Sequence, residues 1–293
     1  FDLYQTPTVL NVPQNDPRRG NAILTIPITI AGNPNLQPEE STTFSTGFVY
    51  TPEQLPATRL AVTYWNIEQE QRLQRFTQAT LLANEAFFPE RVVRGTPTPA
   101  DIAAGFPGRL LSLDLSNVNA GNLETDGIDL ELTASWQTGI GTFAPSIAAT
   151  QVLGFDAADF PSTASVDRRG AANTQGAIPE TRVTGSLAWN LKGFGLVPTV
   201  RYISSYDDVA QATNVRTGGS VESQTLIDLQ ATLDFETAFN AGVWTRGLNL
   251  RLGVLNLTDE DAPFALVSGP AGYDTSQGDL RRRFSYVMLQ KTF

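Results

Sequence analysis

Apolar and polar residues alternate along most of the chain. In GLNLRLGVLNL (247–257), every second residue from Leu248 to Val254 is apolar, and the residues between them are polar or glycine. The same period of two occurs in DGIDLELTASW, TRVTGSLAWNL and QTLIDLQATLDF. A period of two predicts β-strands with one apolar and one polar face. Each run is roughly ten residues or slightly longer, which suits a tilted strand that crosses a bilayer.

The runs predict an all-β fold, an antiparallel transmembrane β-barrel with about nine crossings in this chain. The crossings are expected near residues 41–51, 57–68, 123–136, 142–153, 180–191, 195–205, 223–236, 246–257 and 283–293. Short links (51–57, 137–142 and 191–194, with a somewhat longer one at 236–245) alternate with long links at 69–108, 155–179, 205–222 and 258–281. This alternation is typical of outer-membrane barrels, which have short periplasmic turns and long extracellular loops.

Two segments need a separate interpretation. RLLSLDLSNVN (109–119) resembles a strand, but a crossing there would place the next short turn on the wrong side of the membrane. We interpret it as an extracellular extension of the strand near 123–136. Residues 1–40 are expected to form an extracellular loop that leads into the strands. An odd number of crossings does not fit a complete bacterial barrel, so we expect the chain to be part of a longer one.

A soluble β-sandwich also shows alternation, but its strands are usually about half as long. The polar faces are small and neutral or acidic, as expected beside a wet lumen. No run of about 18 apolar residues is present, so no transmembrane helix is predicted. The net charge of −10 argues against a nucleic-acid partner. The chain has no cysteine and no histidine, which excludes disulfides, ordinary zinc sites and histidine-based catalysis, and we expect no cofactor.

Several segments, in family order, resemble TonB-dependent outer-membrane receptors. They are GNPNLQPEESTTFSTGFVYTPE (32–53), FPERVVRG (88–95) with DIAAGFPGRLLSLDLSNVNAG (101–121), VNAGNLETDGIDLELTASW (118–136), LGVLNLTDEDAPF (252–264) and YDTSQGDLRRRFSYVMLQKTF (273–293). FDLYQTP (1–7) is similar to a stretch before the late strands. The resemblance implies that residues 1–293 are the C-terminal portion of a barrel of about 22 strands, with the plug domain absent.

The resemblance also implies a function. Such receptors lie in the Gram-negative outer membrane, in contact with lipid and lipopolysaccharide. They take up a scarce ligand, such as a ferric siderophore, cobalamin or an oligosaccharide. Uptake is driven by the TonB energy-coupling complex, which would act through the N-terminal part that is absent here. The alternative is a passive porin or another non-enzymatic barrel. Outer-membrane barrel enzymes rely on a histidine, so we expect no enzyme.

Candidate ligand contacts are aromatic and arginine residues of the long loops, because aromatic rings stack and guanidinium groups bind anions bidentately. They are Phe87, Phe88, Arg91, Arg94, Phe106, Tyr206, Arg216, Phe264 and Tyr273. For each of them, loop packing or lipopolysaccharide contact is the alternative role. Arg281–Arg283 could bind lipopolysaccharide phosphates or close the start of the last strand through salt bridges.

The last strand carries a separate signal. The resemblance implies that Val287, Leu289 and Phe293 form the signal read by the barrel-assembly machinery, since they fall on one face and the chain ends on an aromatic residue. Lys291 departs from this pattern, in which an apolar residue or tyrosine is usual. A lysine near a membrane interface can extend its ammonium group into the polar layer, so we keep the assignment.

Overall fold

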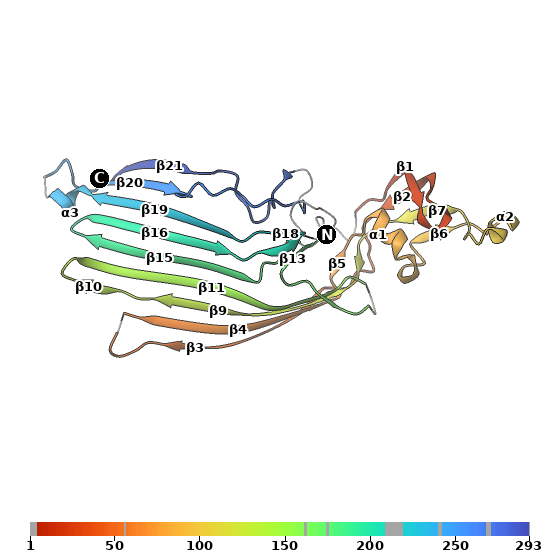
Figure 1. The fold of residues 1–293 in the computed structure, drawn as a ribbon. Coiled ribbons are helices and arrows are strands. Elements are labelled where there is room, and N and C mark those ends of the chain that lie inside the picture. The colour runs from red at the N-terminus through yellow and green to blue at the C-terminus, as the bar shows by residue number, and fades with distance from the viewer. Residues whose placement is uncertain are drawn as a thin grey trace. The chain divides into compact units, whose positions relative to one another are not determined.

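The computed structural model describes residues 5–55, 57–160, 163–173, 176–208, 219–239, 242–267 and 271–292. They fold as two compact units (Figure 1). Unit 1 comprises the described residues within 1–42, 68–123 and 157–166, and unit 2 comprises those within 43–67, 124–156 and 167–293. None of the helices in the described part of the chain has the length and apolarity that a membrane span requires.

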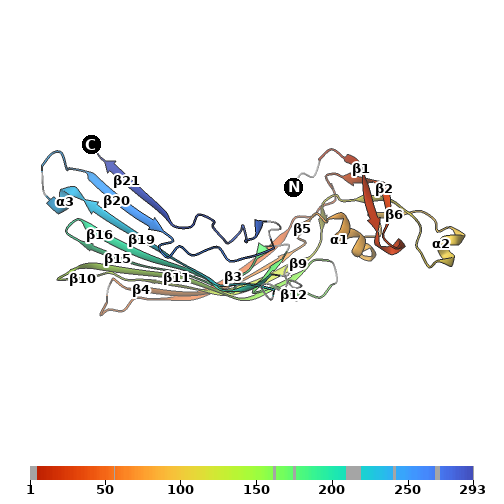
Figure 2. The same cartoon turned by 45° about the horizontal axis from the view of Figure 1, so that its top comes forward.

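Unit 2 is built on a sheet in which nine long strands follow one another in chain order. The sheet is curved, with β3 and β21 at its two edges (Figure 2). The strands are β3 (Glu40–Tyr50), β4 (Arg59–Glu70), β9 (Asn122–Thr133), β11 (Gly141–Ala158), β15 (Thr181–Leu191), β16 (Phe194–Ile203), β19 (Gln224–Asp234), β20 (Leu248–Leu255) and β21 (Phe284–Lys291). All nine predicted crossings are therefore confirmed as strands, each within a few residues of its expected bounds.

The links between the strands also alternate as predicted. Those at 51–58, 134–140, 192–193 and 235–247 lie at one end of the sheet, here called the turn end. The long links lie at the opposite end of the sheet, here called the loop end. The two-residue link Lys192–Gly193 has φ angles of 47° and 84°, as a tight hairpin turn requires. A Cβ at Gly193 would lie 2.7 Å from the carbonyl oxygen of Asp234, so glycine is also needed for space.

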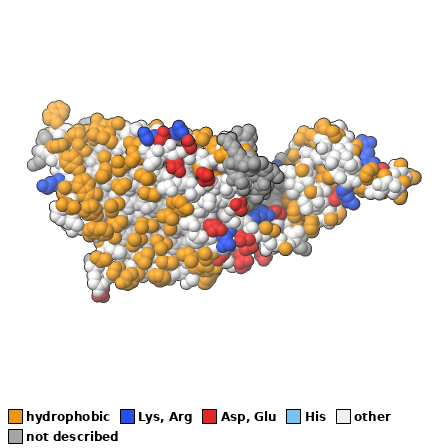
Figure 3. All heavy atoms as spheres, in the orientation of Figure 1, with side chains coloured by type: hydrophobic (Ala, Val, Ile, Leu, Met, Phe, Trp, Pro, Cys, Tyr) orange, Lys and Arg blue, Asp and Glu red, His pale blue; other side chains and the backbone are white. Residues whose placement is uncertain are grey.

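The register gives the sheet an apolar face and a polar face. One row of directly opposed residues across β11, β15, β16, β19, β20 and β21 consists of Phe143, Trp189, Leu196, Ala231, Leu252 and Val287. The adjacent row consists of Thr142, Asn190, Gly195, Thr232, Arg251 and Met288. On the face seen in Figure 3, hydrophobic side chains gather over the part of the sheet near α3 and β10, and charged ones lie closer to the loop end.

Unit 1 has its own sheet and its own core. Its sheet has the order β1-β2-β7-β6, with β1 and β2 paired as a hairpin from Thr8↔Ile30 to Asp16↔Ala22. Buried apolar residues of this sheet and of α1 form the core, including Ile26, Leu81 and Leu110. The elements are β1 (Thr8–Asp16), η1 (Pro17–Arg19), β2 (Ala22–Ile30), β5 (Leu73–Gln74), α1 (Gln78–Ala83), η2 (Glu85–Phe87), β6 (Val92–Arg94), α2 (Pro99–Ala103), β7 (Leu110–Asp114) and β8 (Val118–Asn119).

The interpretation of residues 109–119 as an extension of β9 is wrong. Strand β7 pairs in parallel with β2 (Ile28↔Leu113) and antiparallel with β6, so it belongs to the sheet of unit 1. Leu110 and Leu113 are 0% and 1% exposed. The apolar residues of this run are therefore buried in the core of a loop unit and do not face lipid. The β1–β2 hairpin shows that much of 1–40 is regular structure.

The loop end of unit 2 holds a second, smaller sheet in the order β14-β13-β17-β18. Its apolar centre contains Ala172, Tyr206, Val221 and Ala265. The remaining elements of unit 2 are β10 (Trp136–Thr138), β12 (Val166–Asp167), β13 (Ala171–Asn173), β14 (Gly176–Ala177), β17 (Tyr206–Asp208), β18 (Ser220–Val221) and α3 (Phe235–Phe239). β10 and β12 both pair with β11, so they extend the large sheet at its two ends.

Candidate functional site

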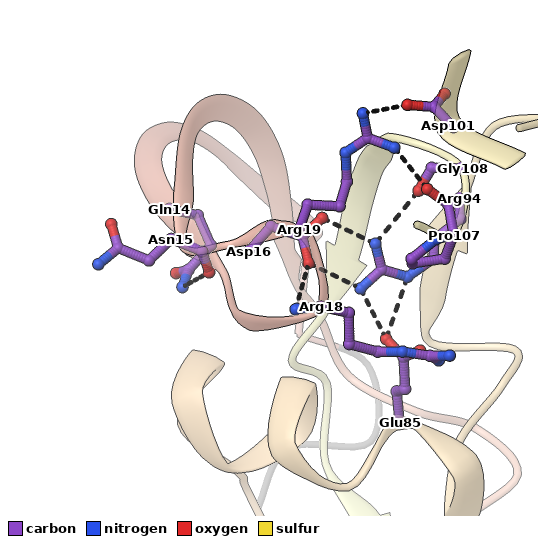
Figure 4. Close-up of polar contacts among 10 residues, drawn as sticks. All are labelled: Gln14, Asn15, Asp16, Arg18, Arg19, Glu85, Arg94, Asp101, Pro107 and Gly108. Atoms are coloured by element: carbon purple, nitrogen blue, oxygen red, sulfur yellow. Dashed lines mark hydrogen bonds and ion pairs between the residues drawn. The ribbon is translucent and has the colours of Figure 1, made fainter. Parts of the chain in front are cut away.

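Arg94 lies at the centre of an ionic cluster in unit 1 (Figure 4). Its Nη1 and Nη2 donate to the two carboxylate oxygens of Asp16, at 2.8 and 3.0 Å. Its Nε and Nη2 donate to Glu85 at 3.1 and 2.8 Å, and Nη1 also donates to the carbonyl of Gly108 at 3.2 Å. Arg18 forms an ion pair with Glu85 from the more exposed side.

The guanidinium of Arg94 has five N–H donors, and five hydrogen bonds use them. The Asp16 side chain is fully buried, and it also accepts from the backbone N–H of Arg18 at the start of η1. The hydrogen bond to Asp16 is the main reason why the pKa of Arg94 is raised, and Glu85 adds to the effect. The cluster therefore joins the β1–β2 hairpin to the segment around β6 and η2.

Arg91 and the phenylalanines near it serve the core of unit 1. Arg91 is 8% exposed, and its Nη1 donates to the carbonyl of Ser116 at 2.7 Å. Phe88 is 3% exposed and belongs to the core. Phe87 remains 43% exposed, but it stacks on Phe160 with ring centroids 5.6 Å apart. Of these three candidates, Phe87 alone presents a large surface to solvent.

Phe106 lies on the second ionic group of unit 1. The guanidinium carbon of Arg19 lies 5.7 Å from the centre of the Phe106 ring, within the range of a cation–π interaction. Arg19 also donates to Asp101 at 2.6 Å and to the carbonyl of Pro107. Asp101 accepts from the backbone and hydroxyl of Thr98, which completes the N-terminal cap of α2. The Arg19 hydrogen bond, followed by those from Thr98, holds the pKa of Asp101 well below its usual range.

In unit 2, the candidates Tyr206, Phe264 and Tyr273 lie at the loop end. Tyr206 is 5% exposed, and its hydroxyl donates to Asp274 at 2.8 Å. Burial, followed by this contact, raises the pKa of Tyr206. Phe264 and Tyr273 face each other in an isolated antiparallel bridge. Arg216 lies outside the described residues. These contacts join the 204–223 link to the 256–283 link.

The polar face of the large sheet carries charged pairs of its own. Arg201 on β16 donates to both carboxylate oxygens of Asp228 on β19, at 3.0 and 3.2 Å. Asp129 accepts from Thr150 at 2.6 Å, and Glu131 pairs with Arg59 at 3.1 Å. Near Arg201, a hollow of about 250 Å³ opens between the sheet and the segment before β21. This face can offer fixed donors and acceptors to a polar ligand.

The family model described as "TonB dependent receptor-like, beta-barrel" matches residues 3–257. The chain belongs to this family. Solved structures share the fold. One of them, a single-substitution variant of the ferric enterobactin receptor PfeA from Pseudomonas aeruginosa, is 15% identical to this chain, with a TM-score of 0.55. The match covers 91% of this chain and 33% of the receptor. A double-substitution variant of PfeA is also 15% identical to this chain, with a TM-score of 0.57. That match covers 96% of this chain and 34% of the receptor. This chain thus spans about a third of the length of those receptors. No curated protein matches it.

The last strand of this receptor barrel presents Val287 and Leu289 on the apolar face, 72% and 66% exposed. Phe293 lies outside the described residues, and recognition by the assembly machinery stays a prediction. Lys291 lies on the same face, and its Nζ donates to the carbonyls of Trp244 (3.1 Å) and Arg246 at the turn end. The ammonium group is thus bound to backbone carbonyls of the adjoining link, and its place in the polar layer of a membrane stays a prediction.

Sequence reasoning missed the acidic members of these clusters. Asp16 precedes Pro17, and an aspartate before proline is a signal for a helix start, which could have indicated its capping role. Nothing local connects Asp16 with Arg94, 78 residues away. Arg201 and Asp228 fall on polar positions of their strands, so the alternation places them on one face but does not show that they pair. Whether any of the candidates contacts a ligand stays a prediction.

Proposed function

We propose that this chain is the wall and loop region of an outer-membrane receptor that binds a scarce ligand at the cell surface and imports it by TonB-dependent transport. The observation that carries the proposal is the family match over residues 3–257. The sheet supports it, because one apolar face and one polar face are what the wall of a membrane channel needs. The protein would be a transporter and not an enzyme.

The ligand that we favour is a ferric siderophore. One protein of similar fold, a PfeA variant, has been solved in complex with enterobactin. At 15% identity these structures show the fold alone, so the argument for the ligand rests on the chemistry of the loops. Unit 1 offers the exposed ring of Phe87 and the Arg19–Phe106 pair. Phe87 and Phe106 remain candidates for contacting the ligand or for supporting the loops that bind it. The other candidates are Phe88, Arg91, Arg94, Tyr206, Arg216, Phe264 and Tyr273.

An uptake assay in intact cells tests the function. The complete receptor is expressed in a Gram-negative host that lacks its own siderophore receptors, and uptake of radioactive iron from ferric enterobactin is measured. Labelled cobalamin and a labelled maltooligosaccharide are tested in parallel. We expect saturable uptake of one ligand that disappears when the host tonB gene is deleted or a protonophore is added.

The same assay separates the proposal from its alternative. A passive porin would admit small solutes in proportion to their concentration, and neither the tonB deletion nor the protonophore would change the rate. That result would contradict the proposed function. The two alternatives also differ in their expected partners. The barrel-assembly machinery and lipopolysaccharide would contact a receptor or a porin, whereas only a receptor needs the energy-coupling complex.

A further inference from the structure

The link between β19 and β20 (235–247) carries exposed apolar side chains at the turn end of the large sheet. Trp244 and Val243, here called the apolar tip, are 90% and 75% exposed, the highest values among the large apolar residues that the structure describes. Phe239 of the same link is 55% exposed. Single apolar residues are common on a protein surface, but a group of them marks a site of contact with a partner or a membrane.

The first part of this link, α3, packs against the apolar face of the sheet. Phe194 on β16 lies two residues before Leu196, a member of the apolar row, so the two side chains point to the same face. The ring of Phe239 meets the ring of Phe194 edge-on, with centroids 6.3 Å apart. Phe235 adds a second ring contact to Phe239 at 5.9 Å. The apolar face therefore extends onto α3.

The last part of the link is held to the same face by Lys291. The side chain of Lys291 shares the face of Leu289, two residues before it on β21. Its Nζ donates to the carbonyls of Trp244 at 3.1 Å and of Arg246. Because the lysine rises from the apolar face, the backbone at 244–246 lies on that side of the strand ends. Figure 1 shows α3 and the C-terminal end of the chain at this end of the sheet.

The link is also ordered by its own hydrogen bonds. The backbone N–H and the hydroxyl of Thr245 both donate to the carbonyl of Gly242, at 3.2 and 3.0 Å. The N–H of Gly247 donates to the carboxylate of Glu236 at 3.1 Å. That carboxylate also pairs with Arg246 at 3.7 Å, while the Arg246 side chain stays 73% exposed. The apolar tip is thus presented on an ordered backbone, which lowers the entropic cost of binding.

We propose that this link is a membrane anchor: the apolar tip enters the headgroup layer of the phospholipid leaflet at the turn end, and Lys291 holds the link in place. Lipid is the partner that we favour, because the tip continues the apolar face that a barrel turns to the bilayer. Tryptophan suits this layer, since its ring is largely apolar and carries one N–H donor. The exposed guanidinium group of Arg246, beside the tip, would face lipid phosphates.

The same inference accounts for Lys291, which stands where an apolar residue or tyrosine is usual. An apolar side chain has no donor for the two carbonyls and tyrosine has one, whereas an ammonium group has three. The lysine therefore gives up apolar contact at this position and fixes the link instead. The inference goes beyond the proposed function, because it applies to a receptor and to a passive porin alike and does not depend on the ligand.

Fluorescence quenching in lipid nanodiscs tests the position of the tip. The complete receptor carries bimane on Val243→Cys, after any other cysteine has been changed to serine, in a bilayer of phosphatidylethanolamine and phosphatidylglycerol. Asn249→Cys is the matched control, because Asn249 lies near the same end of the sheet but on the polar face, opposite Gln290. We expect lipids with a doxyl group near the glycerol to quench most of the emission at position 243 and little at 249. Aqueous iodide should quench in the reverse order.

Two results would overturn the anchor. Strong quenching of both labels by iodide, with none by doxyl lipid, would place the tip in water. Protection of the label at position 243 from both quenchers in outer-membrane vesicles would show that a protein covers the tip. Val243 is exposed and lies in a link, so this labelling leaves the strands and Lys291 unchanged.

Two lysine variants of the labelled receptor test the positioning role of Lys291. Lys291→Met removes both hydrogen bonds to the link and keeps a side chain of similar length, so quenching by doxyl lipid at position 243 should fall towards the level at 249. Lys192→Met removes the same charge from the turn at 192–193 and should leave the quenching unchanged. A heat-modifiable shift on a gel checks that each barrel is folded. Unchanged quenching in Lys291→Met, or an equal fall in both variants, would overturn the role of this lysine.

Discussion

The substitution Arg94→Met should loosen unit 1 more than any other single change in its ionic cluster. It removes all five hydrogen bonds of the guanidinium group. The carboxylate of Asp16, which is fully buried, then keeps the backbone N–H of Arg18 as its one donor among the described residues. Removing one partner of a buried ion pair costs about 3–5 kcal/mol, because the other charge stays buried without compensation. Since about 1.4 kcal/mol is a factor of ten, the opening equilibrium of unit 1 should rise by a hundredfold or more.

Hydrogen exchange of the complete receptor, read by mass spectrometry on peptides from β1 and β2, measures this opening. The nine residue pairs of that hairpin, from Thr8↔Ile30 to Asp16↔Ala22, should exchange faster in Arg94→Met. Arg18→Met is the matched control, because Arg18 pairs with the same Glu85 but its side chain is 55% exposed, and exposed pairs contribute at most about 1 kcal/mol. Equal acceleration of exchange in both variants would refute the reasoning, since it would mean that loss of the buried pair costs no more than loss of the exposed one.

Three further changes have defined outcomes. Tyr206→Phe should destabilise the loop end by about 1–3 kcal/mol, because Asp274 loses a donor. Burial raises the pKa of Tyr206 in the folded state, so the native protein should lose stability above about pH 10. The variant should not show this loss, and denaturation measured at a series of pH values tests the difference. In Gly253→Ala the new Cβ would meet the Tyr286 ring at 2.2 Å; the cost of about 1–3 kcal/mol should lower the temperature at which the barrel unfolds on a gel. Asp101→Asn should remove a stabilisation of α2 that is present at neutral pH and is lost as the pH falls below about 4. Amide hydrogen exchange in α2, corrected for the intrinsic exchange rate at each pH, measures this stabilisation.

The nine strands could be predicted because their signal is local. A wall with lipid on one side and water on the other requires alternation in every strand, and the register confirms that opposed residues share a face. The length of each link then follows from the positions of the strands. The tight turn at Lys192–Gly193 is a further local signal, because glycine in a two-residue link favours a hairpin. The pattern thus contained enough information for the order of the strands.

Unit 1 could not be predicted in the same way, because its structure depends on distant pairings. The run 109–119 has the same alternation as a crossing, and only its pairing with β2, at Ile28↔Leu113, shows that it belongs elsewhere. Arg91 was selected as a residue that could bind an anion, but it donates hydrogen bonds to the backbone carbonyls of Ser116 and Asn117. The carboxylates of Glu90 and Asp114 also lie within ion-pair distance of its guanidinium group. A composition rich in arginine and aromatic residues describes a loop core as well as it describes a binding surface.

The difference between the two units bears on how a receptor can change its specificity. The large sheet depends on rows of side chains that run across many strands, so a change in one strand affects its neighbours. Unit 1 instead encloses its own core, with residues such as Leu81, Leu110 and Leu113 that are at most 1% exposed. A loop unit that buries its own apolar residues needs little from the wall that carries it. Its surface, including Phe87 and Phe106, can therefore vary while the strands and their register stay fixed.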